Sequence, residues 1–361
     1  MISTALLIFF TAFIVSCIAM PNIIKISVKK LLFDAPTEER KIHKKNISNL
    51  GGIGIFIGFF FSILLYRIIC DSLELSSLAA AAVLLFFVAL KDDLIPSSPI
   101  SRLFYQVLIA SIIVFIGQVH FDHIPIFEAG TTMRRIVNIL FSLFFVVGII
   151  NAMNFIDGID GLAASLSVFL SLIFGYIFYQ YGQLNYSYTS LALGGAVLGF
   201  LIFNFAPARI FMGDIGSMLI GVFMAIFGIQ LANMDTLPLG LLQIRYPGTI
   251  MFALLIVPIM DLITVVGIRL YLKKSPFEAD KRHLHHRLLV LGLSHPAICF
   301  SLLLFNILVL AVAFLLQKTD SSLWAALAIT LLAATFELLV LWLYSKKKKL
   351  DDKELDIVNH K

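Results

Sequence analysis

Acidic and amide side chains gather in three short segments of this sequence, and their types suit the handling of phosphate groups. The segments are the adjacent pair Asp92-Asp93, the stretch Asn151–Gly161, and Asp214 within Phe211–Ser217. Carboxylate and amide oxygens are hard ligands of the kind that Mg²⁺ prefers, and Mg²⁺ commonly shares its coordination with substrate phosphates. The three segments therefore predict a site where a metal ion and phosphates meet.

The stretch Asn151–Gly161 carries an amide or a carboxylate at every third position, namely Asn151, Asn154, Asp157 and Asp160. If the stretch is helical, these side chains line one face. Two glycines in the same stretch let a ligand approach the backbone closely. A polar helix end that packs against its neighbours is the alternative interpretation.

Asp214 and the Asp92-Asp93 pair have their own alternatives. Glycines flank Asp214, which favours a phosphate or metal site, although an acid at a helix start is also stabilised by the helix dipole. Adjacent carboxylates raise each other's pKa, so one of the pair is a candidate general base, and a solvated turn is the alternative. Arg102 follows at the start of an apolar run, where a cation would meet a lipid phosphate.

Two basic segments complete the set of candidate residues. Lys281–Arg287 concentrates Arg282, His283, His285 and His286 in seven residues. Arginine and histidine suit phosphate binding, while a zinc site and a plain solvated loop are the alternatives. The second segment holds Lys41 and His43 before a pair of glycines, and its charge would attract an anionic substrate.

The elements that position these residues must be membrane-spanning helices. The 361 residues are 60% hydrophobic and 14% charged, with a mean hydropathy of +0.98, whereas a soluble protein carries about 25% charged residues. Eleven apolar runs approach the length that crosses a bilayer. They are 2–24, 51–70, 75–91, 101–118, 134–152, 161–180, 188–206, 215–232, 248–270, 296–316 and 321–344. We expect an all-α integral membrane protein with about eleven transmembrane helices.

Charge decides the sidedness of these spans. When the loops are assigned alternately to two sides, 22 of the 27 Lys and Arg residues fall on one side, and the positive-inside rule makes that side cytoplasmic. The N-terminus is then outside and the C-terminus inside. All the polar segments described above lie on the cytoplasmic side, which predicts one active site at that face. We expect one polytopic domain over 1–361, with 345–361 as a basic cytoplasmic tail.

The motifs and their order resemble the polyprenyl-phosphate N-acetylhexosamine-1-phosphate transferases, which are glycosyl transferase family 4. The similar segments are Arg40–His43 with Gly51-Gly52, Asp92-Asp93 through Gln106, Asn151–Gly161, Phe211–Gly221 and His283–His286. The last, of the form HxHH, resembles the branch that uses undecaprenyl phosphate and UDP-N-acetylglucosamine. Two features depart from the pattern: Arg102 stands where many members have Lys, and a Pro96–Pro99 turn follows the acidic pair.

The resemblance implies a reaction in which undecaprenyl phosphate attacks the β-phosphorus of a UDP-N-acetylhexosamine and UMP leaves. It implies that Asp214 and Asn154 hold Mg²⁺, for which Mn²⁺ would substitute, and that Asp160 meets the uracil end of the nucleotide. Asp92 or Asp93 would orient or deprotonate the lipid phosphate. The remaining implied site residues are Arg102 on a phosphate, Asp157 without a fixed role, Arg282, His283, His285 and His286 on the pyrophosphate and sugar, and Lys41 and His43 on substrate.

Several alternatives stay open at this point. One alternative is the same reaction with another UDP-N-acetylhexosamine as the donor. Another is a phospho-N-acetylmuramoyl-pentapeptide transferase, and the HxHH segment disfavours this second alternative. A covalent intermediate on an acidic residue is the alternative to direct displacement. A transporter is the rival class, disfavoured because the acids gather at one interface and not at the midplane. We further expect a bacterial cytoplasmic membrane location, membrane lipid as a partner, a homodimer, and no nucleic-acid partner.

Overall fold

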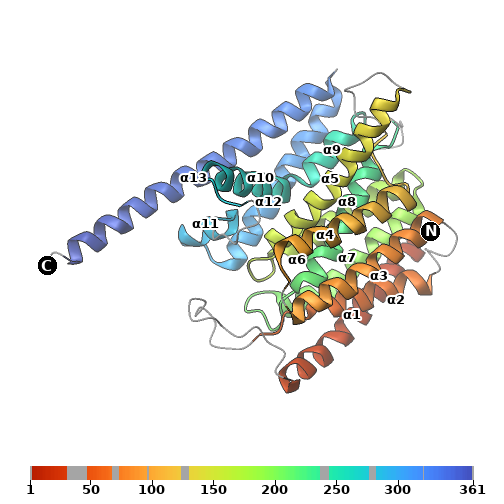
Figure 1. Cartoon of the computed structure of the whole chain (residues 1–361), viewed down its shortest axis with the longest axis horizontal. Coiled ribbons are helices and arrows are strands. Elements are labelled where there is room, and N and C mark those ends of the chain that lie inside the picture. Colours follow the sequence, from red (N-terminus) through yellow and green to blue (C-terminus); the bar gives the residue numbers. More distant parts are fainter. Residues whose placement is uncertain are drawn as a thin grey trace.

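The computed structural model describes residues 2–30, 47–66, 73–95, 97–122, 130–235, 244–275, 282–319 and 321–359, and every element in these ranges is a helix (Figure 1). The elements are α1 (Ile2–Lys30), α2 (Gly51–Leu65), α3 (Leu73–Leu94), α4 (Pro99–Ser111), the π-helix η2 (Ile112–Ile116), α5 (Thr132–Ile156), α6 (Leu162–Gln180), α7 (Leu184–Asn204), α8 (Gly213–Ala232), α9 (Pro247–Leu254), α10 (Ile256–Tyr271), α11 (Leu284–Val290), α12 (His295–Leu315), the 3-10 helix η3 (Leu316–Lys318) and α13 (Ser322–Asn359).

The expectation of an all-α integral membrane protein is confirmed. Eight of the described helices are long and apolar enough to cross a bilayer, and the bent pair α9–α10 would make a ninth. Each expected apolar run overlaps a helix, although α2 is short and α3 ends in charged residues. The count of eleven spans and the outside N-terminus therefore remain predictions.

Large apolar side chains cover the outer surface of this bundle. Ile18, Phe144, Phe300 and Leu331 are each more than 60% exposed. On a soluble protein such a surface would drive aggregation, but against lipid it is favourable. The exposed apolar surface therefore agrees with a bilayer as the solvent.

Among the eight described helices that could cross a bilayer, α8 is the most buried, with 89% of its most apolar stretch buried inside the protein. It packs against α2, α3, α5, α6, α7 and α9. Small residues allow the close approach, because a methyl group added at Gly52 of α2 would come within 2.2 Å of the Gly216 nitrogen of α8. Membrane helices commonly pack through glycine in this way. The start of α8 is consequently held firmly by its neighbours.

Two expected helices are interrupted. The run 248–270 bends by 67° between α9 and α10. Pro258 explains the break, because it has no N–H for the Leu254 carbonyl and its ring clashes with that turn. The Asn151–Gly161 stretch is helical only to Ile156, where α5 ends. Its last five residues form a turn.

The basic tail is an extension of the last helix. α13 runs for 38 residues without a break, from Ser322 to Asn359, and its C-terminal part projects away from the bundle (Figure 1). The segment 345–359 thus continues a helix that begins among the spans. The expectation of a single domain with a basic tail stays a prediction.

Candidate active site

The start of α8 is fixed by a carboxylate from another helix. Asp93, near the end of α3, accepts the backbone N–H groups of Asp214 (2.8 Å) and Ile215 (3.1 Å). Gly213 has φ +72°, and a Cβ there would lie 2.0 Å from the Asn49 carbonyl oxygen, so only glycine fits. Asp93 caps α8 and sets the position of Asp214. Burial raises the pKa of Asp93 to about 8, and which of Asp92 and Asp93 acts as a base stays a prediction.

Asp214 lies against an amide from α5. The Asn154 Nδ2 group donates to Asp214 Oδ1 at 2.8 Å and to Ser217 Oγ at 2.9 Å. Because an amide nitrogen carries two hydrogens, these two contacts use both of them and leave the Asn154 oxygen as its remaining ligand atom. The sequence-predicted metal pair is thus brought together by α5 and α8.

Arg102 of α4 lies between two carboxylates. Its Nε is 2.5 Å from Asp92 Oδ2, an ion pair without the alignment of a hydrogen bond, and its Nη2 is 3.6 Å from Asp214 Oδ2. Asp92 also accepts the Ser97 N–H at 2.6 Å. Asp92 is buried, but 38% of the Arg102 side chain is exposed. A phosphate can therefore reach Arg102 while Asp92 stays beside it.

Apolar residues border this ion pair. A small pocket next to Asp92 and Arg102 is lined by Leu85, Ile109 and Met218, which come from α3, α4 and α8. The pocket has a volume of about 10 Å³, which is room for about one water molecule, so these side chains pack against the ion pair. The assignment of Asp92 and Arg102 to the lipid substrate stays a prediction.

An amide pair joins two of the sequence motifs. Asn151 Nδ2 donates to Gln106 Oε1 at 2.7 Å, and Gln106 Nε2 donates back to Asn151 Oδ1 at 3.3 Å. Gln106 is buried on α4, one turn after Arg102. The pair therefore holds α4 against α5, which keeps Arg102 next to the Asn154–Asp214 contact.

The donor set around Asp214 fits Mg²⁺. Asp214 and Asn154 supply one carboxylate and one amide oxygen, and the described residues contain no group of three or more His, Cys, Asp or Glu that could close around a metal. Mg²⁺ is usually held by one or two protein groups and completes its shell with water and substrate phosphates, whereas structural zinc needs four protein ligands. The chemistry of these donors thus suits an ion shared with a substrate.

The turn after α5 separates the two acids that were expected on one helical face. Asp160 is buried and its Oδ2 accepts the Ala208 N–H at 3.0 Å, with His295 Nδ1 at 3.5 Å. Gly161 has φ +81°, which lets the chain reverse, and its N–H donates to Asn204. Asp160 therefore contacts the 204–208 loop and the start of α12.

The carboxyl group of Asp157, in the turn after α5, has a raised pKa. Loss of water contact, followed by the negative charges of Asp214 and Asp160, raises the pKa of Asp157 to about 7. A carboxyl group that titrates near neutral pH matches the requirement for proton transfer. Its position close to both other acids agrees with a catalytic assignment, but its role in the reaction stays a prediction.

The histidine segment docks onto the α5 turn. His283 Nδ1 is 2.9 Å from Asp261 Oδ2, and its ring lies 4.9 Å from that of Phe155. His285 packs directly on Gly158, since a Cβ there would fall 2.1 Å from His285 Nε2. The glycine in the acidic turn therefore makes room for a histidine.

Burial keeps His285 neutral. The side chain is 1% exposed, and burial, with the neighbouring His286 charge, lowers the pKa of His285 to about 3. In this state His285 offers one donor and one acceptor nitrogen. It is therefore not suited to acting as a cation, and its contact with the donor substrate stays a prediction.

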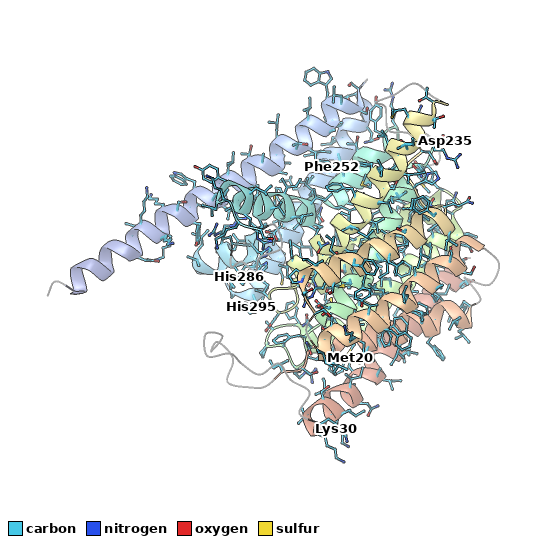
Figure 2. All side chains as sticks on the ribbon, in the orientation of Figure 1. Met20, Lys30, Asp235, Phe252, His286 and His295 are labelled. Atoms are coloured by element: carbon cyan, nitrogen blue, oxygen red, sulfur yellow. The ribbon has the colours of Figure 1, made fainter. Side chains whose placement is uncertain are left out.

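The remaining sequence-predicted residues fall into two groups. Arg282 and His286 belong to the same segment, and the His286 ring lies 4.3 Å from that of His285. Figure 2 shows His286 and His295 near one another and Asp235 toward the opposite end of the bundle. Lys41 and His43 lie outside the described residues.

Sequence reasoning missed the buried charges beneath the histidine segment. Asp261 of α10 is 0% exposed, and Arg287 of α11 pairs with Glu337 of α13 inside the protein. The available signal was a carboxylate in the middle of each of two apolar runs, 248–270 and 321–344. Such residues are costly in a membrane and usually have a partner.

The chain has relatives among known transferases. The family model of glycosyl transferase family 4 matches residues 75–232. A Bacillus subtilis protein, named a probable undecaprenyl-phosphate N-acetylglucosaminyl 1-phosphate transferase, is 32% identical over 341 residues, or 90% of this chain and 89% of the relative. The chain belongs to glycosyl transferase family 4.

Two further relatives of this glycosyl transferase family 4 chain carry similar names. A decaprenyl-phosphate N-acetylglucosaminephosphotransferase of Mycolicibacterium smegmatis is 33% identical over 71% of this chain and 68% of its own. An undecaprenyl-phosphate alpha-N-acetylglucosaminyl 1-phosphate transferase of Escherichia coli K12 is 31% identical over 74% of this chain and 72% of its own. The family model spans the acidic pair, the Asn151–Gly161 stretch and Asp214.

Proposed function

We propose that this chain transfers N-acetylglucosamine 1-phosphate from UDP-N-acetylglucosamine to undecaprenyl phosphate, as the first membrane step of a cell-envelope polysaccharide pathway. The observation that carries the proposal is the convergence of Asp92, Arg102, Asn154 and Asp214, in a chain whose relatives are named for this reaction. The location is a bacterial cytoplasmic membrane.

The reaction is a displacement at phosphorus. An oxygen of the lipid phosphate attacks the β-phosphorus of the donor, the bond from that phosphorus to the bridging oxygen breaks, and UMP leaves with the electron pair. The product is N-acetylglucosaminyl-pyrophosphoryl-undecaprenol. Such transfers depend mainly on positioning and on neutralising phosphate charge. A direct displacement needs fewer steps than a covalent intermediate and is preferred here.

The residues divide this work between them. Arg102 holds the lipid phosphate, and Asp92 orients it or takes its proton. Asp214 and Asn154 would hold Mg²⁺, which would supply positive charge against the donor pyrophosphate. Asp160 receives the uracil end of the nucleotide.

The histidine segment binds the pyrophosphate and the sugar of the donor. His283, His285, His286 and Arg282 contact the pyrophosphate and the sugar, because the segment lies directly over the turn that carries Asp157 and Gly158. The HxHH pattern favours N-acetylglucosamine over the muramoyl-pentapeptide donor. A different UDP-N-acetylhexosamine is the second candidate, since nothing in the described contacts distinguishes the sugars.

Membranes that contain the protein test the proposal. Radiolabelled UDP-N-acetylglucosamine and undecaprenyl phosphate should give an organic-soluble labelled product in the presence of Mg²⁺ or Mn²⁺, and a chelator should stop the reaction. Label that remains in the aqueous phase would overturn the proposed function. A panel of UDP-sugars in the same assay identifies the donor.

The variant Asp214→Asn tests the metal assignment. It keeps the shape of the side chain but removes the charge that Mg²⁺ requires, so we expect turnover to be lost while the protein stays in the membrane. Full activity of Asp214→Asn would remove this residue as a metal ligand. Asp235→Asn, at the opposite end of the bundle (Figure 2), is the matched control and should keep wild-type activity.

A further inference from the structure

Asp261 is a fully buried carboxylate that the reaction described above does not use. It lies on α10 and is 0% exposed. Its Oδ1 accepts the backbone N–H of Leu284 at 2.6 Å, and its Oδ2 lies 2.9 Å from His283 Nδ1. Both oxygens therefore contact the start of α11, at the point where the histidine segment turns toward the site.

These two contacts fix the state of the His283 ring. A carboxylate can only accept hydrogen bonds, so Nδ1 of His283 carries the proton and Nε2 is the nitrogen left for a ligand. The contact from Oδ1 to the Leu284 backbone prevents the carboxylate from turning away. The Phe155 ring, 4.9 Å from the imidazole, limits the rotation of His283 from another side.

A second buried carboxylate beneath α11 differs from the first in one decisive respect. Glu337 of α13 pairs with Arg287, which is 1% exposed and follows the histidines. Glu337 thus anchors the end of α11, whereas Asp261 contacts the imidazole of His283 itself. If the acids only anchored α11, neither would need to contact the His283 imidazole. The effects of Asp261 and Glu337 can therefore be distinguished by experiment.

We propose that Asp261 is a positioning residue that holds His283 in the Nδ1–H tautomer and so presents Nε2 as a hydrogen-bond acceptor to a hydroxyl or N–H group of the donor sugar. The inference rests on the proposed function, because it assigns His283 to the donor. The same logic governs histidines whose second nitrogen is held by a carboxylate in metal sites and catalytic triads. In this chain the carboxylate comes from the bent α9–α10 pair, so the bend places a fully buried acid next to a histidine that is itself only 7% exposed.

A double-mutant cycle tests the proposal. Asp261→Asn keeps the shape but offers an N–H to His283, which favours the wrong tautomer. We expect kcat to fall about 10- to 100-fold, as when a histidine's outer partner is removed from a metal site, with little change in KM for UDP-N-acetylglucosamine. His283→Asn keeps an amide near Nδ1 but lacks Nε2, so adding Asp261→Asn to it should cost nothing more.

Glu337→Gln is the matched control for this cycle. It also removes a buried charge beneath α11 but leaves the Asp261–His283 contact, so its effect should multiply with that of His283→Asn. A multiplicative loss for Asp261→Asn with His283→Asn, or a wild-type kcat for Asp261→Asn alone, would overturn the proposal. An inactive wild-type chain would instead overturn the proposed function.

A second comparison covers the case in which Asp261→Asn does not fold. His283→Gln places an amide near Nε2, whereas His283→Asn places one near Nδ1 and retains the contact with Asp261. If Nε2 is the working nitrogen, His283→Gln keeps more activity than His283→Asn. The reverse order would show that the contact with Asp261 is only an anchor.

Discussion

Gly158 is the residue at which the acidic turn and the histidine segment touch. A methyl group at this position would fall 2.1 Å from His285 Nε2, so the ring must move if the glycine is replaced. A displacement of about 1 Å in an active site can cost about 100-fold in rate. We therefore expect Gly158→Ala to lower the transfer rate strongly.

Gly148→Ala is the matched control for this change. Gly148 lies on α5, ten residues earlier, and no atom lies within 4 Å of the Cβ that it would gain. Alanine is favoured over glycine inside a helix by about 0.5–1 kcal/mol, so the control should keep its activity. Equal rates for the two variants would contradict the tight contact at His285.

Asp157 predicts a dependence of stability on pH. Its pKa is raised from 3.8 to about 7 in the folded chain. Between these values the folded chain holds a proton that the unfolded chain has lost, so stability falls as the pH rises through this window. The test compares the midpoint of thermal unfolding at pH 5 and pH 8, in detergent with a chelator present. We expect this midpoint to fall less for Asp157→Asn than for the wild type. The same pH dependence in both would refute the raised pKa.

At this scale the sequence predicted the residue types better than their contacts. The family resemblance implied the metal pair Asn154 and Asp214, and the structure brings the two side chains to 2.8 Å. Asp93 was expected on a substrate phosphate, but it caps a helix that begins 120 residues later. Contacts between residues so far apart depend on helix packing, which spacing along the chain does not encode.

Among the elements, α8 has the greatest influence on the site. Its first turn carries Asp214, and the Asp93 carboxylate holds that turn through two backbone N–H groups. Loss of a helix cap costs about 0.5–2 kcal/mol. We expect Asp93→Ala to lower the unfolding midpoint in detergent and to lower activity as well, because Asp214 loses its support.

The cap of α5 provides a comparison at the other end of the bundle. Thr131 accepts the Arg134 N–H at 3.2 Å, so Thr131→Ala also removes a cap. It should lower stability to a similar degree without lowering the transfer rate. A fall in rate as large as that of Asp93→Ala would mean that the site responds to stability in general and not to the position of α8.

The elements themselves were largely predictable, and their interruptions were not. Apolar runs of sufficient length identified the helices, since lipid leaves few other structures available. The end of α5 at Ile156 depends on the turn that seats Gly158 on His285, a tertiary contact. The bend before α10 had a local signal in Pro258, but its angle of 67° is set by packing against other helices.

The whole molecule should present its active site to one side of the membrane. The clustering of 22 of 27 basic residues on one side predicts that this side is cytoplasmic. UDP-N-acetylglucosamine does not cross a bilayer, so inside-out vesicles should convert external donor and right-side-out vesicles should not. Permeabilising the right-side-out vesicles is the control and should restore the reaction. Conversion of external donor by intact right-side-out vesicles would contradict the sidedness.

The unbroken course of α13 has a mechanical consequence. A helix of 38 residues is about 57 Å long, nearly twice the roughly 30 Å of a bilayer's hydrocarbon core. The C-terminal part of α13 carries Lys346, 5.4 Å from the Trp342 ring centroid, and earlier in the same helix Glu337 pairs with Arg287 of α11. We expect a force on the C-terminal part, such as attraction to an anionic lipid surface, to tilt α13 and so to shift the histidine segment that Arg287 anchors.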